Sequence, residues 1–469
     1  MLKKALSIIF SVLIIASLGV VSVSANSAQT HWSGVDASGM FVKEENCPLE
    51  VKSELLTFDI SEFPEIYYET AQQFLDYSAK VTAEYVFKNP ADYTVNATLV
   101  FPFGNAPDYI YYDEESRYSA DTEKFDITVN GEVIEKKLRH TLSYGFENFD
   151  YDEASSKLHD EFVTDEFFSP DTPVKVYVFE INEIDEAFTS AYTSAPLSVD
   201  PDKSRIILAD CSIYNYQDNA VYAGLWAENK TSFTMYVIGE DIDKVPEWTV
   251  YEDASEENTI DVEVKLLFTD DSTFKDIALM FHREESGVSE IDWYNAIVDK
   301  ANYFDNRHGF LGADYEFMIG DSLMRWYEYE LTVKSGETVT NTVTAPIYPS
   351  IDQDYTPSVY GYTYLLSPAK NWASFGTLDI VINTPYYITE NNLGKLTHSD
   401  NTYTISLDSL PDSELEFTLC SEENPEKQKS SFSFPIEIIA ILSFVIFIIV
   451  LILCIVLVVI IYKNKHLLK

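Results

Sequence analysis

Hydrophobic and polar residues alternate along much of the chain. In residues 79–87 every odd-numbered position is apolar or aromatic, and residues 95–101 repeat the pattern. Successive side chains of a strand point to opposite faces of its sheet, so each segment is predicted to be a half-buried strand. Asn89-Pro90-Ala91-Asp92 between them is a turn sequence. Residues 79–102 are therefore predicted to form a β-hairpin.

A second hairpin is predicted around Asn130-Gly131, which joins Lys124–Val129 to Glu132–Leu138. Asn-Gly accepts the positive φ angles of a type I′ turn, whose twist matches that of two paired strands. Alternation also predicts strands over Pro173–Ile181, Arg205–Ala209, Ser232–Ile238, Ile260–Phe268, Tyr327–Lys334, Glu337–Pro346, Val359–Leu366, Thr377–Asn383, Thr402–Leu407 and Leu415–Leu419.

One long segment has helical periodicity instead. Apolar residues recur at spacings of three and four between Trp293 and Phe304. Such spacing places them on one face of a helix. Ser289, three residues before Asp292, resembles an N-terminal cap. The sequence therefore predicts a helix over residues 289–305.

Both ends of the chain carry segments typical of membrane-targeted proteins. Residues 1–25 have a basic start, a hydrophobic middle and the ending Val23-Ser24-Ala25, a combination typical of a cleaved secretory signal peptide. Residues 438–461 contain no charged residue. As a helix they would span about 36 Å, enough to cross a hydrocarbon core of about 30 Å. We expect them to form a transmembrane helix.

Basic residues indicate the orientation of this predicted span. Lys463, Lys465 and Lys469 follow it at once, and basic residues beside a span stay on the cytoplasmic side. Residues 462–469 are therefore predicted to be a short cytoplasmic tail, and the N-terminal part is predicted to lie outside. The expected localisation is the cell membrane, with a single span that makes the membrane an integral partner.

Composition narrows the classes of partner. The 469 residues carry a formal net charge of −46, and 14% of them are aromatic. Such a charge repels nucleic acid, which is therefore excluded as a partner. The aromatic content is too high for a chain that stays disordered. We expect a folded acidic ectodomain whose partner is an unidentified extracellular protein or glycan.

Cysteine is scarce in the predicted ectodomain. Cys47, Cys211 and Cys420 lie there, and Cys454 lies in the predicted span. Three thiols allow at most one internal disulfide, and whether one forms stays open. The hydrophobic core must therefore hold the fold.

The predicted fold class is mainly β: one or two β-sandwich domains with a few short helices, plus one C-terminal transmembrane helix. After a polar leader at residues 26–45, the expected division is a first β-rich region at 46–245 and a second at 246–425, which holds the helix near 289–305. An alternative stays open, in which the early hairpins and the late strands form one sandwich and the middle of the chain is inserted.

Common catalytic signatures are absent from the sequence. It has no HExxH, GxSxG, GxGxxG or Walker A motif. With 77 Asp and Glu residues, carboxylate pairs occur by chance, so no catalytic residue and no cofactor-binding residue is named. The histidines of the predicted ectodomain are interpreted as surface or packing residues. They are His31, His140, His159, His282, His308 and His398.

Calcium is the one candidate cofactor, because loops of an acidic extracellular β-protein can offer it oxygen ligands. Asp200-x-Asp202-x-Ser204 begins like an EF-hand loop, but Arg205 replaces the required glycine and Cys211 replaces the closing glutamate. The looser acidic clusters are Asp270 and Asp271 with Asp276, and Asp352 with Asp354. The metal ligands stay unknown.

Two aromatic clusters are candidate ligand platforms. They are Tyr109-Ile110-Tyr111-Tyr112 and Trp372, which follows Asn371. Exposed rings can stack on sugars or on peptides, and the alternative interpretation is packing within or between domains. A continuous strip of exposed rings would favour glycan binding.

Residues 83–90, Ala-Glu-Tyr-Val-Phe-Lys-Asn-Pro, together with Phe101-Pro102-Phe103, resemble part of a vault protein inter-alpha-trypsin (VIT) domain. The turn Val129-Asn130-Gly131 and the strand–turn–strand around Ser335-Gly336 are similar to that family too. The family's domain is shorter, residues 141–325 have no counterpart in it, and its following metal-binding domain is absent. The resemblance implies a β-sandwich used for contacts and carries over no catalytic residue.

These observations predict a membrane-anchored extracellular binding or interaction protein of unidentified ligand. Enzymatic activity is left undecided, with its absence favoured. The alternative is a membrane-anchored hydrolase that acts on cell-wall or extracellular glycans or peptides through an unrecognised acidic site. Close, buried carboxylates in one cleft would favour that alternative.

Overall fold

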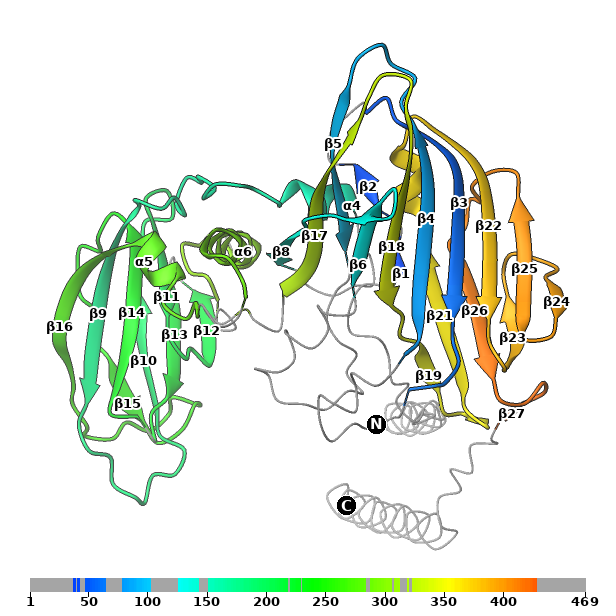
Figure 1. Ribbon diagram of the computed structural model, residues 1–469. Coiled ribbons are helices and arrows are strands. Elements are labelled where there is room, and N and C mark those ends of the chain that lie inside the picture. Colours follow the sequence, from blue (N-terminus) through cyan, green and yellow to red (C-terminus); the bar gives the residue numbers. More distant parts are fainter. Residues whose placement is uncertain are drawn as a thin grey trace, which may run out of the picture. The chain divides into compact units, whose positions relative to one another are not determined.

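The computed structural model describes residues 37–38, 40–42, 47–64, 78–102, 125–142, 151–217, 220–228, 230–283, 287–305, 308–312, 319 and 323–427. Within them the protein is mainly β, as Figure 1 shows. The predicted signal peptide, transmembrane helix and cytoplasmic tail lie outside the described residues. Among the helices that are described, none is long and hydrophobic enough to cross a membrane.

The chain divides into two compact units. The larger comprises residues 30–351 and 360–423. In the smaller, the described residues are 352–359 and 424–427, where β20 (Tyr355–Thr356) pairs with β27 (Glu426–Lys427).

An eight-stranded sheet is the largest layer of the larger unit. Its order is β24-β25-β22-β3-β4-β18-β6-β7, with β22 and β3 parallel and the remaining pairs antiparallel. The strands are β3 (Glu50–Asp59), β4 (Lys80–Lys88), β6 (Asp126–Val129), β7 (Glu132–Val133), β18 (Thr338–Pro346), β22 (Ser374–Asn383), β24 (Thr397–Ser399) and β25 (Thr402–Leu407).

Two smaller sheets share one hydrophobic core with this sheet, and we refer to the three together as the framework. Phe58 and Tyr85 of the large sheet, Leu99 of the second and Phe417 of the third are all buried in that core. The second sheet has the order β2 (Phe41–Val42), β5 (Val95–Pro102), β17 (Leu323–Val333), β8 (Lys137–Leu142). The third has the order β1 (Ala37–Ser38), β21 (Val359–Leu365), β26 (Leu415–Cys420), β23 (Tyr387–Asn391), with β19 (Ser350–Asp352) also paired to β21.

The two strands predicted within residues 79–102 form, but they do not pair with each other as a hairpin. β4 pairs with β3 and β18, whereas β5 pairs with β2 and β17. Asn89 carries the chain between the two sheets: its side-chain amide donates to the carbonyls of Tyr93 and Val333 at 2.8 and 2.9 Å. The apolar faces of β4 and β5 are therefore buried in one core from different sheets. The hairpin around Asn130-Gly131 is confirmed, with φ of 52° and 80° at its two turn residues. Its second arm is shorter than predicted: it ends at Val133, and Lys137 and Leu138 belong to β8, which pairs with β17 in another sheet.

Residues 173–273 form a second sandwich, inserted between the early and late strands of the framework. Its two sheets have the orders β11-β14-β9-β16 and β12-β13-β10-β15, and one core lies between them. The strands are β9 (Pro173–Ile181), β10 (Tyr192–Leu197), β11 (Ser204–Leu208), β12 (Ile213–Gln217), β13 (Ala220–Trp226), β14 (Ser232–Gly239), β15 (Thr249–Tyr251) and β16 (Val264–Thr273). We refer to it as the inserted sandwich.

Strand pairing departs from the expected series of regions at 46–245 and 246–425. Residue 245 lies between β14 and β15, whose sheets share the core of the inserted sandwich. Early and late strands pair instead, as β4 does with β18 and β5 with β17. The structure therefore has the alternative arrangement, in which early and late strands form one sandwich and the middle of the chain is inserted. The apolar faces of the early strands are buried by partners more than 200 residues later in the chain.

Four helices lie among the described residues, and two of them cover a face of the sheet β11-β14-β9-β16. The four are α4 (Tyr151–Ser156), α5 (Phe274–Ala278), α6 (Glu290–Phe304) and the 3₁₀ helix η3 (Ser367–Asn371). The predicted helix over 289–305 is confirmed as α6, and the Ser289 side chain accepts the Asp292 backbone N–H as its cap. Ile277 of α5 and Ile297 of α6 lie in one core with Val174, Ile207 and Ile238 of the sheet β11-β14-β9-β16.

Candidate functional site

The sheet β12-β13-β10-β15 turns only one face toward the core of the inserted sandwich. Along β13, Val221, Ala223 and Leu225 are buried in that core, whereas Tyr222 and Trp226 are 39% and 40% exposed. This is the period-two pattern of a strand. Both large rings therefore lie on the face that points away from the core.

Neighbouring strands extend this outward face. Ile213 of β12 lies opposite Gly224, and Tyr192 of β10 lies opposite Trp226. Opposite residues of an antiparallel pair share one face of the sheet. Ile213 is 44% exposed, whereas Tyr192 is buried. We refer to the outward face formed by Ile213 and the rings of Tyr222 and Trp226 as the aromatic surface.

Gly224 makes room for the ring of Tyr192. A β-carbon at position 224 would lie 2.4 Å from the Tyr192 hydroxyl oxygen and 2.6 Å from the Thr193 carbonyl oxygen, closer than such atoms can approach. The Tyr192 side chain therefore crosses β13 at Gly224, and its hydroxyl lies 3.5 Å from the carbonyl oxygen of Ile213. Trp226 packs edge-on against it, with ring centroids 5.6 Å apart. The buried tyrosine thus supports the exposed tryptophan.

A carboxylate lies near the supporting ring. Burial raises the pKa of Tyr192, and the Cys211 thiol and the Glu256 carboxylate add to the shift. Glu256 has a φ of 58° in a turn where its N–H donates to the Asp253 carbonyl at 3.3 Å. The charge of Glu256 therefore acts on the ring that supports Trp226.

The opposite side of β12 also carries rings. Tyr214 and Tyr216 are 42% and 44% exposed. The Tyr214 ring lies 5.3 Å from that of Phe310, and the Tyr216 ring stacks on His308 at 3.8 Å and 17°. All of β12 is exposed at the edge of its sheet, but the rings on this side contact Phe310 and His308 of the same chain.

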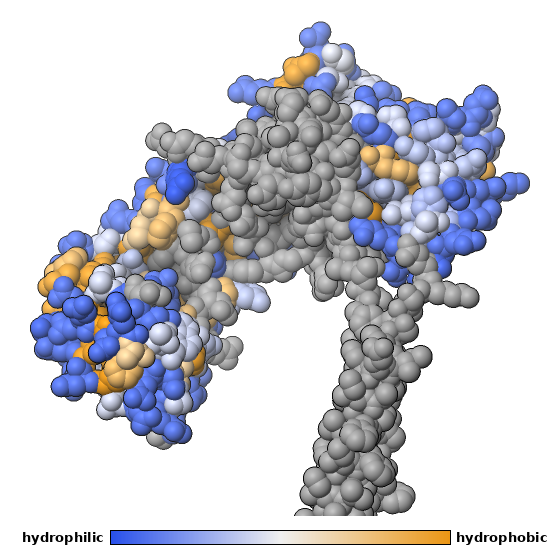
Figure 2. Space-filling model, turned by 90° about the horizontal axis from the view of Figure 1, so that it is seen from below, coloured by the Kyte–Doolittle hydropathy of each residue, from blue (hydrophilic) through white to orange (hydrophobic). Residues whose placement is uncertain are grey.

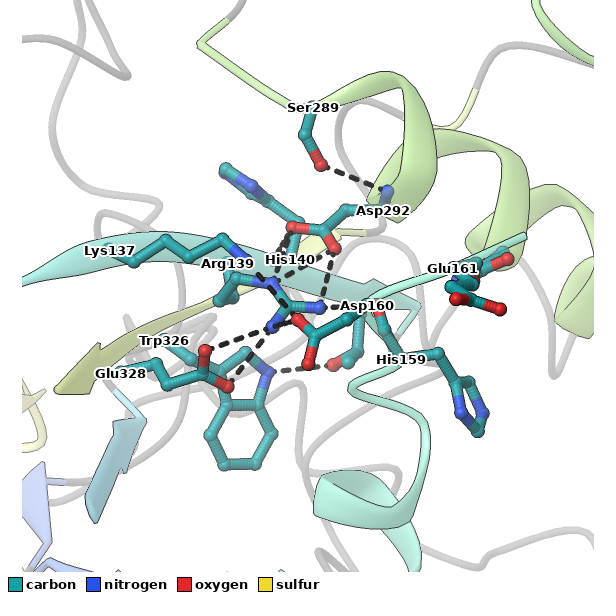
Figure 3. A network of polar contacts seen from close by, with 12 residues as sticks. Lys137, Arg139, His140, His159, Asp160, Glu161, Ser289, Asp292, Trp326 and Glu328 are labelled. Carbon is teal, nitrogen blue, oxygen red and sulfur yellow. Dashed lines mark hydrogen bonds and ion pairs between the residues drawn. The ribbon is translucent and has the colours of Figure 1, made fainter. Parts of the chain in front are cut away.

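A buried ion pair joins β8 to α6 (Figure 3). Arg139 of β8 is 1% exposed and Asp292 of α6 is 2% exposed. The arginine Nε donates to the two carboxylate oxygens at 3.1 and 3.3 Å, and the His140 backbone N–H donates to the same carboxylate at 2.9 Å. Because the Ser289 side chain occupies the helix cap, the Asp292 carboxylate is left to bind the framework strand.

Two further carboxylates meet the same guanidinium. Arg139 Nη1 donates to Asp160 at 3.1 Å and to Glu328 at 3.0 and 3.2 Å, and Nη2 donates to the His159 carbonyl at 2.6 Å. The guanidinium uses all of its nitrogens in this way. These carboxylates are close together, but each is bound to the arginine, so the arrangement stabilises the fold and does not favour the hydrolase alternative.

His140 does not titrate near neutral pH. Burial lowers its pKa to about 3, and the charges of Arg325 and Arg139 add to the effect. A general base works best with a pKa near the operating pH. His140 is therefore a neutral core residue, in line with its interpretation from sequence.

The acidic loops considered for calcium are engaged within the protein. In three of them the first aspartate accepts a backbone N–H from a residue one or two positions later, at 3.1, 2.9 and 2.9 Å. The pairs are Asp200 with Asp202, Asp270 with Asp271, and Asp352 with Asp354. Among the described residues, no group of three or more His, Cys, Asp or Glu side chains is placed to hold a metal ion.

Calcium binding stays a prediction with a direct test. If calcium binds, the midpoint of thermal unfolding of residues 26–430 rises over that in chelator, because a ligand at 100 times its Kd stabilises the folded state by about 2.7 kcal/mol. Magnesium at equal ionic strength is the control. Equal midpoints with both ions would end the calcium hypothesis.

The structure locates one of the two aromatic clusters singled out in the sequence. Trp372 is buried and packs on Phe87, with ring centroids 4.6 Å apart, so it is a core residue. Residues 109–112 lie outside the described residues. The aromatic surface itself was not predicted, although the alternation of small and aliphatic residues with Tyr222 and Trp226 along β13 was its signal.

The three cysteines of the predicted ectodomain are buried. Cys47 belongs to the core of the framework and Cys211 to the core of the inserted sandwich. Cys420 ends β26. All three therefore contribute to packing.

Comparison with known proteins adds no family. No family model matches the chain, and no curated protein matches its sequence. A solved structure of a candidate nutrient-binding protein from Legionella pneumophila is similar over 84% of this chain and 72% of that one, with 12% identity and a TM-score of 0.35. A likeness at that level carries no argument about fold or function, and the resemblance to VIT domains stays a prediction.

Proposed function

We propose that the protein is a membrane-anchored extracellular binding protein and that the aromatic surface of its inserted sandwich binds a glycan. The observation that carries the proposal is the pair of outward rings, Tyr222 and Trp226, each about two-fifths exposed on one strand. Rings held rigidly at a surface supply a large flat contact area at little entropic cost. The apolar C–H faces of sugar rings fit such a contact.

Polar neighbours suit the hydroxyl groups of a sugar. Asn215 and Gln217 of β12 lie opposite Tyr222 and Ala220, on the same outward face, and both are exposed. A side-chain amide both donates and accepts hydrogen bonds, as a hydroxyl does. The mixture of rings and neutral amides therefore favours a glycan over an aliphatic ligand.

The spacing of the rings favours a chain of sugars over a single one. Tyr222 and Trp226 are four residues apart on a strand, which corresponds to about 13 Å. One monosaccharide is too short to contact both rings. We infer that the ligand is an oligosaccharide or polysaccharide that lies along β13.

Anchoring is the second part of the proposal. It rests on the uncharged residues 438–461 and the lysines that follow them. An anchor of this kind would hold the inserted sandwich at the cell surface, where extracellular glycans are found. Carbonate extraction of membranes tests it: the full chain should stay in the membrane pellet, and a chain ending at residue 430 should be released.

Glycan binding is tested by substituting the rings. Trp226→Ala and Tyr222→Ala should each weaken binding to the polysaccharide that the wild-type protein retains by about tenfold or more, because truncating a ring at the centre of an interface typically costs about 2 kcal/mol. Affinity electrophoresis in a panel of neutral polysaccharides measures this.

A matched control is Tyr387→Ala, which removes a ring that is 44% exposed on β23 of the framework. It should leave binding unchanged. If every variant is retained as strongly as the wild type, the glycan site lies elsewhere. If the wild type binds no polysaccharide, glycan binding is contradicted.

A further inference from the structure

β16 is the edge strand of the sheet β11-β14-β9-β16. In the described part of the chain it pairs only with β9, over its whole length. Its other edge therefore offers a row of backbone N–H and C=O groups. Such an edge is a template for pairing with another strand, and proteins that stay monomeric usually block it.

Hydrophobic residues at the centre of β16 are exposed. Leu266, Leu267 and Phe268 are 41%, 52% and 52% exposed. Figure 2 shows hydrophobic surface along the left margin of the molecule, the side on which β16 lies in Figure 1. Three adjacent apolar residues on an open edge predict a partner that covers them.

We propose that β16 pairs antiparallel with β16 of a second copy of this chain, with the two-fold axis at Phe268. The two sheets would then join into one continuous sheet across both copies. This dimer is independent of glycan binding, because the aromatic surface lies on the other sheet of the inserted sandwich.

The order of residues along β16 is self-complementary about Phe268. The register against β9 skips one residue between Leu266 and Phe268, so Leu267 is the extra residue of a β-bulge. With the bulge counted as one position, Lys265 lies opposite Asp270 of the second copy, and Leu266 lies opposite its Thr269.

The faces of the sheet agree with this register. Lys265 and Asp270 lie opposite Glu180 and Val176 of β9, which are four residues apart and therefore on one face. The two-fold axis therefore relates two Lys265–Asp270 pairs, and both pairs lie on the same face of the joined sheet. Lys265 contacts Glu263 of its own chain at 3.1 Å, but both side chains stay more than half exposed, so the lysine can reach a second carboxylate.

Charge favours a second copy over a membrane surface as the occupant. The chain carries a net charge of −46, which disfavours anionic lipid and also opposes unspecific self-association. A dimer therefore needs an interface whose own charges attract. β16 supplies one, because its single lysine, Lys265, lies on the other side of the axis from its two aspartates, Asp270 and Asp271. Asp271 is already paired with Lys175 of its own chain at 2.8 Å, which leaves Asp270 for the lysine of the second copy.

A charge swap tests the register. The full-length protein in detergent should have the mass of a dimer by light scattering. Lys265→Asp puts like charges opposite each other twice and should weaken the dimer about tenfold or more. Adding Asp270→Lys to that variant restores both pairs with their signs exchanged and should restore the dimer. Asp261→Lys, an exposed acid before β16, is the control and should leave the mass unchanged.

Cross-linking tests the position of the axis. Cα atoms of directly opposite residues are about 4.5–5.5 Å apart, within the range of a disulfide. Phe268→Cys should therefore give a disulfide-linked dimer on mild oxidation, while Ser272→Cys and the wild-type chain, treated alike, should not. A monomeric wild-type protein, or a dimer unaffected by Lys265→Asp, would overturn the proposal.

Discussion

Asp292→Ala is expected to lower the free energy of unfolding by about 3 kcal/mol, because it leaves the buried Nε of Arg139 without an acceptor, while Glu328 and Asp160 still bind Nη1. Arg139 is 1% exposed, and Asp292 accepts from its Nε as well as from the backbone N–H of His140. The variant removes both contacts at once. Asp292 is also the residue through which α6 binds β8, so the loss should appear as loosening of α6.

Chemical denaturation followed by far-UV circular dichroism measures this effect, and hydrogen exchange of residues 290–304 locates it. Glu290→Ala is the matched control: it removes an exposed acid from the first turn of the same helix and should cost less than about 1 kcal/mol. Replacing both partners, as Arg139→Met with Asp292→Leu, should recover only part of the loss, because Glu328, whose side chain is 13% exposed, then loses its arginine. A loss below 1 kcal/mol in Asp292→Ala would show that the ion pair does not hold α6.

The second large effect concerns Glu54 and pH. Glu54 of β3 is 1% exposed within the framework, opposite Tyr85 of β4. Burial raises the pKa of its carboxyl from 4.5 to about 8, and the nearby Tyr85 hydroxyl opposes the shift only in part. The folded protein therefore holds a proton at Glu54 that the unfolded chain releases.

The direction in which stability changes with pH follows from this difference in bound protons. Between pH 4.5 and pH 8 the folded state binds more protons than the unfolded state, so the contribution of Glu54 to stability is greatest below pH 4.5 and falls as pH rises toward 8. The contribution of Glu54 to the free energy of unfolding falls by about 1.4 kcal/mol per pH unit, which amounts to about 5 kcal/mol over the whole range. Other carboxylates add their own dependence, so the quantity to compare is the difference between wild type and variant.

Glu54→Gln removes the titrating proton while keeping the size and polarity of the side chain. Its free energy of unfolding, relative to that of the wild type, should therefore rise steadily between pH 5 and pH 8. Glu84→Gln, an exposed position on β4, should show a flat difference over the same range. A flat difference for Glu54→Gln would mean that its carboxyl titrates at an ordinary pKa in the folded protein.

Local patterns were sufficient to predict the type of most elements. The helical spacing from Trp293 to Phe304 and the Ser289 cap predicted α6, and Asn130-Gly131 predicted a hairpin that forms as expected. Each of these signals depends on residues within a single helix or a single turn. β3, β10, β12 and β13 were not predicted. In β3 the register against β4 breaks between Val51 and Ser53, and the charged Glu54 stands at a buried position.

The aromatic surface was not predicted, because residues 220–226 were not recognised as a strand and both faces of β13 carry apolar or aromatic residues. Val221 and Leu225 face the core, while Tyr222 and Trp226 of the same segment do not. Which face is buried depends on the sheet that covers it, and that sheet is built from β9, β11, β14 and β16. Only the packing of the two sheets distinguishes a core tyrosine from a surface one.

The sequence by itself determined the class of the protein: mainly β strands with one longer helix and a strongly acidic composition. Tertiary structure decided how those strands are shared, because alternation reports which side of a strand is buried and says nothing about its partner. It placed β4 and β5 in different sheets, closed the framework around strands from both ends of the chain, and buried Arg139 with Asp292. Partners far apart in the chain meet only when the core closes, and each of these features depends on such partners.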